Sequence, residues 1–184
     1  MSEYFQLLRR DLTASLPAPQ WPAGTQLDHY RDELAPAIHA VLRMTQDQGG
    51  GRVPNLEEWR QQFVSDAEFD PTLCLVASNA EGILGVAQCW TSAFIKNLAV
   101  HPCAQGQGLG RALLLHSFQV FKQRGEPYVD LKVLESNLRA RKLTPLMPRR
   151  LPPPPKPKTP RPPTRPRRPS KRTRARPSWP PQPP

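Results

Sequence analysis

The stretch from Phe94 to Leu115 constrains the fold of this chain more than any other. It starts with an apolar strand pattern, passes through a glycine-rich turn and continues from Arg111 as an apolar helix. Glycines let the backbone approach an anion closely, and the unpaired amides of a first helical turn point at it with the positive end of the helix dipole behind them. Arg111 can add a charge-assisted contact. The stretch therefore predicts a phosphate-binding turn between a strand and a helix.

The spacing of the glycines distinguishes this turn from two other phosphate-binding motifs. The third glycine, Gly110, falls one residue too early for the dinucleotide fingerprint G-x-G-x-x-G, and no Gly-Lys-Ser/Thr follows as in a P-loop. The stretch instead resembles the acyl-coenzyme A signature Q/R-x-x-G-x-G/A of the GNAT N-acetyltransferase superfamily, through Leu98-x-Val100-x-Pro102-x-x-Gln105-Gly106-x-Gly108-x-Gly110-x-x-Leu113. A second family signature is matched downstream by Asn137-x-x-Ala140-x-x-Leu143, and the resemblance covers roughly Gly24 to Leu143.

Hydrophobic periodicity and turn signals predict the order of strands and helices of the GNAT fold, an α/β fold with a mixed sheet and flanking helices. The expected elements are a strand at Thr25–Tyr30, helices at Asp32–Gln46 and Leu56–Ser65, strands at Thr72–Ser78, Ile83–Thr91 and Phe94–Val100, a helix at Gly108–Arg124, a strand at Tyr128–Leu134 and a helix at Ser136–Leu143. The resemblance implies that Phe94–Val100 and Tyr128–Leu134 splay apart and hold the pantetheine arm of the acyl donor. Tyr4–Leu12 fits a strand or a short helix, and its pattern does not decide.

Charge and proline content divide the chain near residue 145. Residues 1–145 hold 14 Lys and Arg against all 15 Asp and Glu, whereas residues 146–184 hold 12 Lys and Arg and no acid. The first part can bury one hydrophobic core, and the Pro/Arg-rich second part cannot. We therefore predict an N-terminal extension at 1–23, a GNAT domain at 24–145 and a disordered basic tail at 146–184. A sheet truncated after its fifth strand would leave Tyr128–Leu134 at an edge.

The cysteines and the apolar segments bear on the compartment. Cys74, Cys89 and Cys103 are an odd number without C-x-x-C or zinc spacing, which suits a reducing cytoplasm and predicts no metal site. The N-terminus carries charges and no apolar run, so it does not read as a signal peptide. No segment approaches the ~18 apolar residues of a membrane span. We therefore expect a cytoplasmic protein with no membrane contact.

The resemblance assigns residues to acetyl-CoA, the acyl donor. It implies that the backbone of Leu98–Val100 pairs with pantetheine and that the following loop and helix start bind the pyrophosphate, while Asn137 contacts the pantetheine arm. The side chains of Leu98 and Val100 also fit core packing, and Asn137 fits a plain helix N-cap equally well. The full set of predicted cofactor-binding residues is Leu98, Ala99, Val100, Gln105, Gly106, Gln107, Gly108, Leu109, Gly110, Arg111 and Asn137.

Catalytic residues are not assigned by the sequence. Transfer to an amine needs a base to hold the amine neutral and often an acid for the leaving thiolate. The tyrosine that the family places after the leucine matched by Leu143 is Thr144 here, and Thr144 is too weak an acid. Lys132 stands where the N-terminal-acetylating branch has glutamate, which argues against that branch. Glu135 and His101 are possible bases, although a solvated glutamate and a loop histidine are the more frequent roles.

The resemblance implies an acetyl-CoA-dependent N-acetyltransferase that transfers acetyl, by direct attack, to an amine of a small molecule or peptide. The alternative is a catalytically impaired CoA-binding protein, truncated or frameshifted, whose basic tail binds nucleic acid. The tail itself allows three interpretations. Its P-x-x-P runs can dock an SH3-type groove, its cations can contact nucleic-acid phosphates, or its abrupt Pro/Arg vocabulary is the product of a shifted reading frame.

Overall fold

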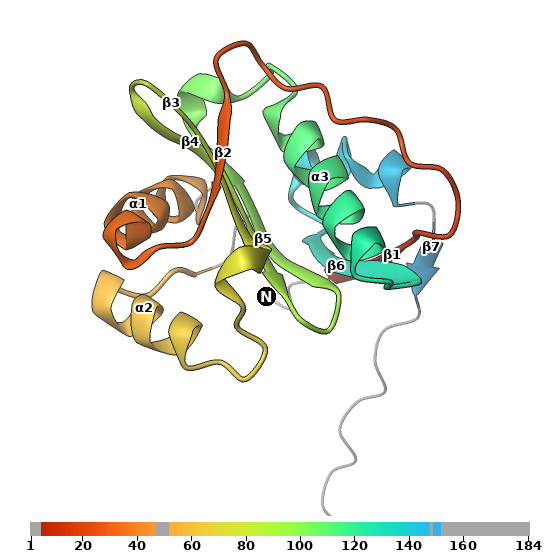
Figure 1. Ribbon diagram of the computed structural model, residues 1–184, viewed down its shortest axis with the longest axis horizontal. Coiled ribbons are helices and arrows are strands. Elements are labelled where there is room, and N and C mark those ends of the chain that lie inside the picture. Colours follow the sequence, from red (N-terminus) through yellow and green to blue (C-terminus); the bar gives the residue numbers. More distant parts are fainter. Residues whose placement is uncertain (1–4, 47–51, 148, 152–184) are drawn as a thin grey trace, which may run out of the picture. The chain divides into compact units, whose positions relative to one another are not determined.

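One mixed sheet forms the centre of the molecule (Figure 1). The computed structural model describes residues 5–46, 52–147 and 149–151. Within these ranges the sheet has seven strands in the order β2-β3-β4-β5-β6-β1-β7. Their bounds are β1 Phe5–Asp11, β2 Gln26–His29, β3 Cys74–Asn79, β4 Gly82–Trp90, β5 Phe94–Val100, β6 Tyr128–Leu134 and β7 Arg149–Leu151.

Helices cover both faces of this sheet. In Figure 1, α1 (Ala35–Thr45) and α2 (Leu56–Val64) lie on one side of β3–β5 and α3 (Leu109–Gln123) lies on the other. Each side has its own hydrophobic core, because the alternating side chains of the central strands point to both faces. A short helix, α4 (Leu138–Arg141), follows β6. The mixed α/β fold predicted from the sequence is confirmed.

Local signals in the sequence placed most of these elements correctly. The two strands expected to form the opening, Phe94–Val100 and Tyr128–Leu134, have the predicted bounds. The side chain of Asn55 caps α2 by accepting a hydrogen bond of 2.9 Å from the Glu58 amide. The long helix α3 begins at Leu109, directly after the left-handed Gly108.

The splay between β5 and β6 is visible in their register. The two strands are parallel, and only Phe94 with Asp130 and Ile95 with Leu131 are paired. Beyond Ile95 the strands no longer pair, so the edge of β5 that faces β6 has no strand partner. On its other edge β5 pairs with β4 throughout, with one shift of register that leaves Lys96 as an extra, bulged residue.

The strand β1 lies beside β6, where the sequence predicts the edge of the sheet. Every residue of β1 pairs with β6 in antiparallel register, from Phe5 opposite Leu134 to Asp11 opposite Tyr128. The expectation that Tyr128–Leu134 lies at an edge is therefore wrong. A guanidinium–carboxylate pair, Arg9 with Asp130 at 2.7 Å, strengthens this contact. The sequence pattern could not locate a strand partner so far along the chain.

The sheet also extends past residue 145. Leu146 and Met147 are buried in the core, and β7 pairs with β1 in antiparallel register. The sequence predicts a domain at 24–145. The structure adds β1 and the segment up to Leu151 to the same sheet, because β1 offers both of its edges for pairing. Residues 152–184 lie outside the described residues. The hypotheses of disorder, nucleic-acid binding, SH3 docking and a shifted reading frame concern this part of the chain.

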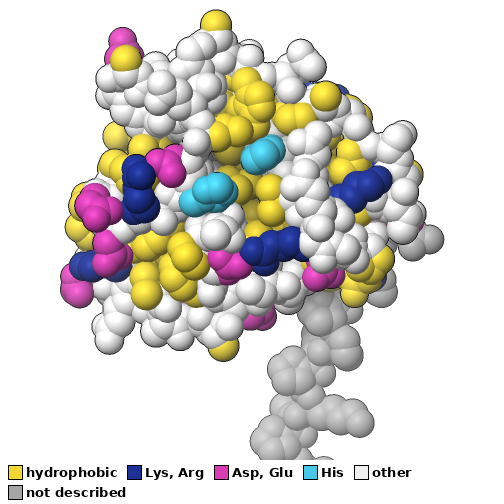
Figure 2. Space-filling view, viewed as in Figure 1, with side chains coloured by type: hydrophobic (Ala, Val, Ile, Leu, Met, Phe, Trp, Pro, Cys, Tyr) yellow, Lys and Arg dark blue, Asp and Glu magenta, His cyan; other side chains and the backbone are white. Residues whose placement is uncertain are grey.

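The connection between β1 and β2 runs over α3 (Figure 1). The Lys122 ammonium donates a hydrogen bond of 2.6 Å to the Ala14 carbonyl, and Trp21 packs edge-on against the His116 ring. Figure 2 shows histidine side chains among hydrophobic ones on this face. Burial is the main cause that lowers the pKa of His116, and nearby His29 lowers it further. The connection therefore forms part of the packed molecule.

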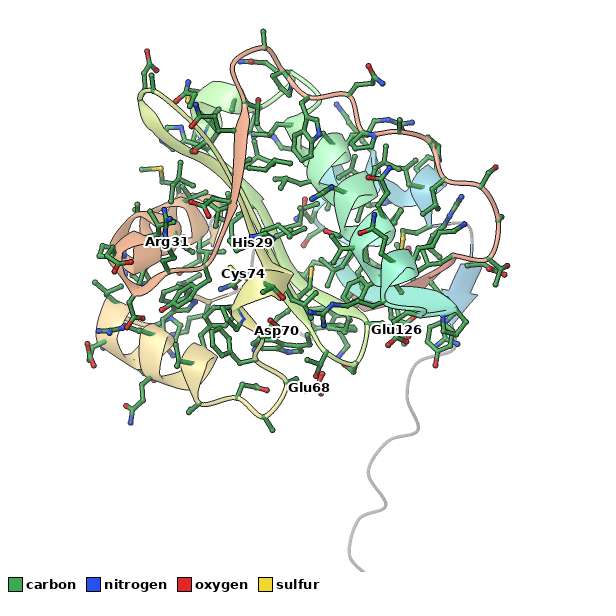
Figure 3. All side chains as sticks on the ribbon, in the orientation of Figure 1. His29, Arg31, Glu68, Asp70, Cys74 and Glu126 are labelled. Atoms are coloured by element: carbon green, nitrogen blue, oxygen red, sulfur yellow. The ribbon has the colours of Figure 1, made fainter. Side chains whose placement is uncertain are left out.

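Polar contacts connect the segment between α2 and β3 to α3 and to the turn between β4 and β5. Asp70, which caps the turn before β3, accepts a hydrogen bond from Arg124 at the end of α3. Glu68 nearby accepts hydrogen bonds from the backbone and side chain of Ser92. Figure 3 labels both acids at this end of the sheet.

The cysteines do not form disulfides within the described residues. Cys74 and Cys89 are buried and Cys103 is exposed. Burial raises the pKa of the Cys74 thiol and raises that of the Cys89 thiol to about 12, so both are inert at neutral pH. The described residues hold no cluster of side chains suited to a metal ion. None of the described helices combines the length and apolar character needed to cross a membrane.

Gly85 of β4 offers a test of the packing between sheet and helix. A Cβ atom there would lie 2.8 Å from Leu113 Cδ1 of α3 and 3.2 Å from the Ala99 carbonyl oxygen. We expect Gly85→Val to lower the free energy of unfolding by about 1–3 kcal/mol, because the buried leucine and the backbone must both shift. Urea denaturation measures this, and a change below about 0.5 kcal/mol would contradict the packing described.

Candidate active site

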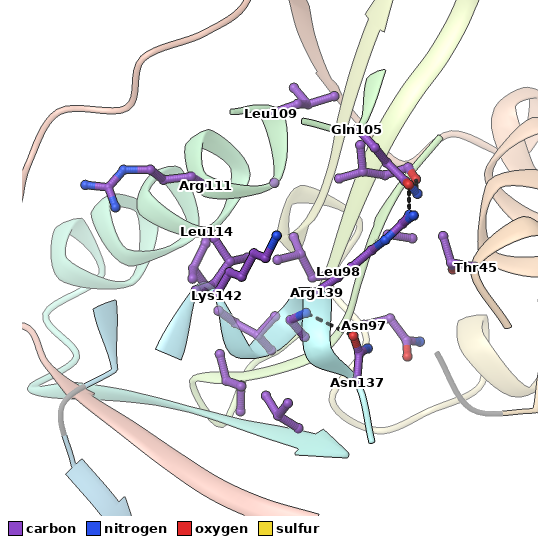
Figure 4. A pocket seen from close by; sticks show the side chains of 18 of the residues that line it. Thr45, Asn97, Leu98, Gln105, Leu109, Arg111, Leu114, Asn137, Arg139 and Lys142 are labelled. Atoms are coloured by element: carbon purple, nitrogen blue, oxygen red, sulfur yellow. Dashed lines mark hydrogen bonds between the residues drawn. The ribbon is translucent and has the colours of Figure 1, made fainter. Parts of the chain in front are cut away.

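A cavity of about 630 Å³ lies where β5 and β6 separate, beside the start of α3 and α4 (Figure 4). Ten of the eleven residues predicted to bind the donor line it. They are Leu98, Ala99, Val100, Gln105, Gly106, Gly108, Leu109, Gly110, Arg111 and Asn137. Gln107 does not line the cavity, and its side-chain amide donates to the Cys103 carbonyl instead. Two segments about thirty residues apart in the sequence are thus brought to one site.

The loop before α3 has the backbone shape that glycines permit. Gly106 and Gly108 have φ of +79° and +87°, the left-handed region that other residues rarely adopt. The Gln105 side chain ties the loop to β5 by donating a hydrogen bond of 2.9 Å to the Val100 carbonyl. Its Oε1 accepts a hydrogen bond from Arg139 of α4, drawn as a dashed line in Figure 4. The loop is therefore held between β5 and α4.

The start of α3 presents amides to the cavity. Leu109, Gly110 and Arg111 form the first turn, whose amides have no carbonyl partner inside the helix. Such amides, together with the helix dipole, are the kind of donors that bind an anion. The Arg111 side chain extends away from the other labelled residues in Figure 4, whereas Arg139 and Lys142 line the cavity from α4. The described lining thus places positive charge beside these amides, and pyrophosphate binding there stays a prediction.

The unpaired edge of β5 gives the site a second recognition element. Leu98, Ala99 and Val100 pair with β4 on one side and have no strand partner on the other. The Leu98 and Val100 side chains pack on the hydrophobic core beneath α3, as the core-packing interpretation predicted. Apart from the Val100 carbonyl, which accepts the Gln105 hydrogen bond, the backbone groups of this segment that point away from β4 remain able to hydrogen-bond an extended, amide-containing ligand in the manner of an added strand.

Asn137 serves as a helix cap. Its Oδ1 accepts a hydrogen bond of 2.9 Å from the Ala140 amide, so the N-cap interpretation is confirmed. Asn137 also lines the cavity, because α4 begins at its wall. Its contact with a bound donor stays a prediction.

Neither of the two possible bases lies in the cavity wall. His101 Nδ1 is 2.9 Å from Cys103 Sγ in the loop, and Glu135 accepts a hydrogen bond of 3.1 Å from Gln6. Among the described residues that line the cavity there is no Asp, Glu, His, Cys or Tyr. Lys132 does line the cavity. It is the residue that stands where the N-terminal-acetylating branch of the family has glutamate.

Sequence reasoning missed part of the cavity wall. Thr45 and Val53 come from the end of α1 and the segment after it, and Lys96 and Asn97 come from the bulged part of β5. The polar pair Lys96-Asn97 inside an apolar strand was the one available signal, because a strand facing two cores seldom carries it.

Solved structures share this fold. A GCN5-related N-acetyltransferase from Sphaerobacter thermophilus superposes with a TM-score of 0.60 at 26% identity, over 71% of this chain and 42% of that one. The ribosomal-protein-S18-alanine N-acetyltransferase of Escherichia coli gives 0.53 at 21% identity, over 65% of this chain and 73% of that one. The described residues therefore have the GNAT fold.

The sequence comparisons agree. The acetyltransferase (GNAT) family model matches residues 38–144, and the chain belongs to that family. Among its relatives are mycothiol acetyltransferases of Propionibacterium freudenreichii, 32% identical over 152 residues (72% of this chain, 47% of the relative), and of Thermobispora bispora, 33% identical over 153 residues (74% and 50%). The chain thus spans about half the length of these relatives.

Proposed function

We propose that this chain is an acetyl-CoA-dependent N-acetyltransferase acting on an amine of a small molecule or peptide. The observation that carries the proposal is the convergence of the glycine loop, the free edge of β5 and the cap of α4 on one cavity of about 630 Å³. Because two relatives are named for mycothiol, an acceptor related to mycothiol belongs in the first panel to be tested.

Each part of the wall has a role in this proposal. The loop from Gln105 and the first turn of α3 hold the pyrophosphate, and the free edge of β5 pairs with the amides of the pantetheine arm. Bound acetyl-CoA supplies an activated thioester. The amine nitrogen would attack the thioester carbonyl carbon and the C–S bond would break, and the proton lost by the nitrogen would pass through water to the departing thiolate. The wall therefore contributes by orienting and desolvating the reactants.

The absence of Asp, Glu, His, Cys and Tyr among the described lining residues predicts a simple pH dependence. The acceptor must lose its proton to solvent, so kcat/KM should rise about tenfold per pH unit below the pKa of the acceptor amine, with no earlier plateau. Thiol release measured from pH 6 to 9 with one aliphatic amine tests this. A plateau near pH 7 would show that a protein base holds the amine neutral.

The lack of these residue types in the described lining also favours a second candidate function, a CoA-binding protein without catalysis. Two measurements separate them. Calorimetric titration with CoA tests the donor site that both share. Thiol release from acetyl-CoA, with and without a panel of amines, tests transfer. CoA binding with no amine-dependent release would leave the alternative, and a failure to bind CoA would overturn both.

A further inference from the structure

The end of the cavity away from the glycine loop carries two cations. The last paired residues of β5 and β6 are Ile95 and Leu131, and the next residue along each strand is a lysine. Lys96 and Lys132 both line the cavity and both are exposed. The Lys96 ammonium lies 4.5 Å from the centre of the Trp90 ring, and the Lys132 ammonium lies 5.9 Å from that of Phe5. Each lysine is thus positioned by an aromatic ring.

These charges are not neutralised by neighbours. Neither lysine forms an ion pair with a residue in the described ranges, and Asp130, on the strand of Lys132, is held by Arg9. The described lining contains no carboxylate. The negative charges of CoA are on its phosphates, and the pantetheine arm that would reach this end is neutral. The donor therefore does not account for the two lysines.

Asn97, next to Lys96, is the neutral polar group of this end. Its Nδ2 donates a hydrogen bond of 2.6 Å to Oε1 of Gln88, which is only 1% exposed. Gln88 therefore fixes the orientation of the Asn97 amide, and the Oδ1 atom of this cavity-lining residue keeps its capacity to accept a hydrogen bond. A carbonyl oxygen held in this way suits the N–H of an amine.

We infer that this end takes an amine acceptor whose other groups are neutral or negative. Asn97 Oδ1 receives an N–H of the reacting amine, and Lys96 and Lys132 disfavour a second positive charge. Polyamines and other polycationic amines are disfavoured by like-charge repulsion, and a carboxylate on the acceptor is attracted. This inference rests on the proposed acetyltransferase function and adds the substrate class.

Three amines with the same four-carbon chain test the inference. They are 4-aminobutanoate, 4-amino-1-butanol and 1,4-diaminobutane, with net charges that rise in that order. We expect kcat/KM with acetyl-CoA to fall in the same order, with about a threefold to tenfold difference between the first and the last. In ~1 M salt, where the Debye length is about 3 Å, the difference should shrink. Calorimetric titration of each amine into the CoA complex provides a second readout.

Charge reversal identifies the residues responsible. Lys96→Glu combined with Lys132→Glu should invert the order of the three amines. Arg43→Glu is the control, since Arg43 is exposed on α1 and does not line the cavity. An order that favours the diamine in the unaltered chain, or one that the double variant leaves unchanged, overturns the inference, as does the absence of any amine binding. A normal CoA titration in the same samples shows that the donor site has not failed.

Discussion

Gly108→Val is expected to weaken CoA binding by about ten- to a hundredfold, because each lost amide contact to a charged phosphate is worth roughly 1.5–3 kcal/mol. Gly108 lines the cavity directly before the first turn of α3. Its φ is +87°, and a Cβ placed on it would meet no atom within 4 Å, so the valine would project into open space at the loop. We infer that this is the space of the pyrophosphate. Calorimetric titration with CoA measures the loss.

A matched glycine separates this loss from simple backbone strain. Gly125, at the other end of α3, has φ +84° and equally open surroundings, but it does not line the cavity. Gly125→Val should therefore lower the melting temperature to the same extent as Gly108→Val through the strained φ, and should leave the CoA affinity unchanged. Equal CoA affinity in the two variants, both folded at the temperature of measurement, would contradict the assignment of the loop.

Leu8→Ala is expected to lower the free energy of unfolding by about 2–5 kcal/mol, since it removes a buried leucine from the main core. Leu8 is 1% exposed, pairs with Leu131 of β6 and lines the cavity. For a domain of ordinary stability this is a large fraction of the total, and the melting temperature should fall by about 5–20 °C. Thermal unfolding followed by circular dichroism measures the shift.

Phe5 on the same strand is the control for this loss. Its side chain is larger but 51% exposed, so Phe5→Ala should cost less than about 1 kcal/mol. A similar small cost for Leu8→Ala would mean that β1 does not pack into the sheet in solution. A large cost together with reduced CoA affinity would show that β1 also supports the cavity wall.

Local patterns account for the parts of the fold that were predicted correctly. The bounds of Phe94–Val100 and Tyr128–Leu134 follow from apolar runs with clear turn signals. Gly108 marks the start of α3 because its left-handed φ is a conformation that glycine adopts readily and other residues rarely adopt. The position of the cavity was implied by the family resemblance, which rests on the spacing of the loop residues and of the residues around the α4 cap.

Contacts between distant segments account for what could not be predicted. The partner of β1 is selected by the shape of the whole sheet, and nothing within Phe5–Asp11 specifies β6. The acceptor end depends on a bulge at Lys96 and on the buried Gln88 of another strand, and the polar pair Lys96-Asn97 in the sequence indicates neither the bulge nor its partner. Such features depend on packing, which sequence periodicity does not report.

The place of β1 in the sheet has a kinetic consequence during synthesis. Arg9 and Asp130, which pair across β1 and β6, are 121 residues apart. At ~5–20 residues per second, β1 waits roughly 6–24 s before the ribosome has made its partner. In that interval its apolar side chains have no sheet to cover them, and the closing of so long a loop slows the final step. We therefore expect the nascent chain, rather than the finished protein, to be the species most prone to aggregate and most dependent on chaperones.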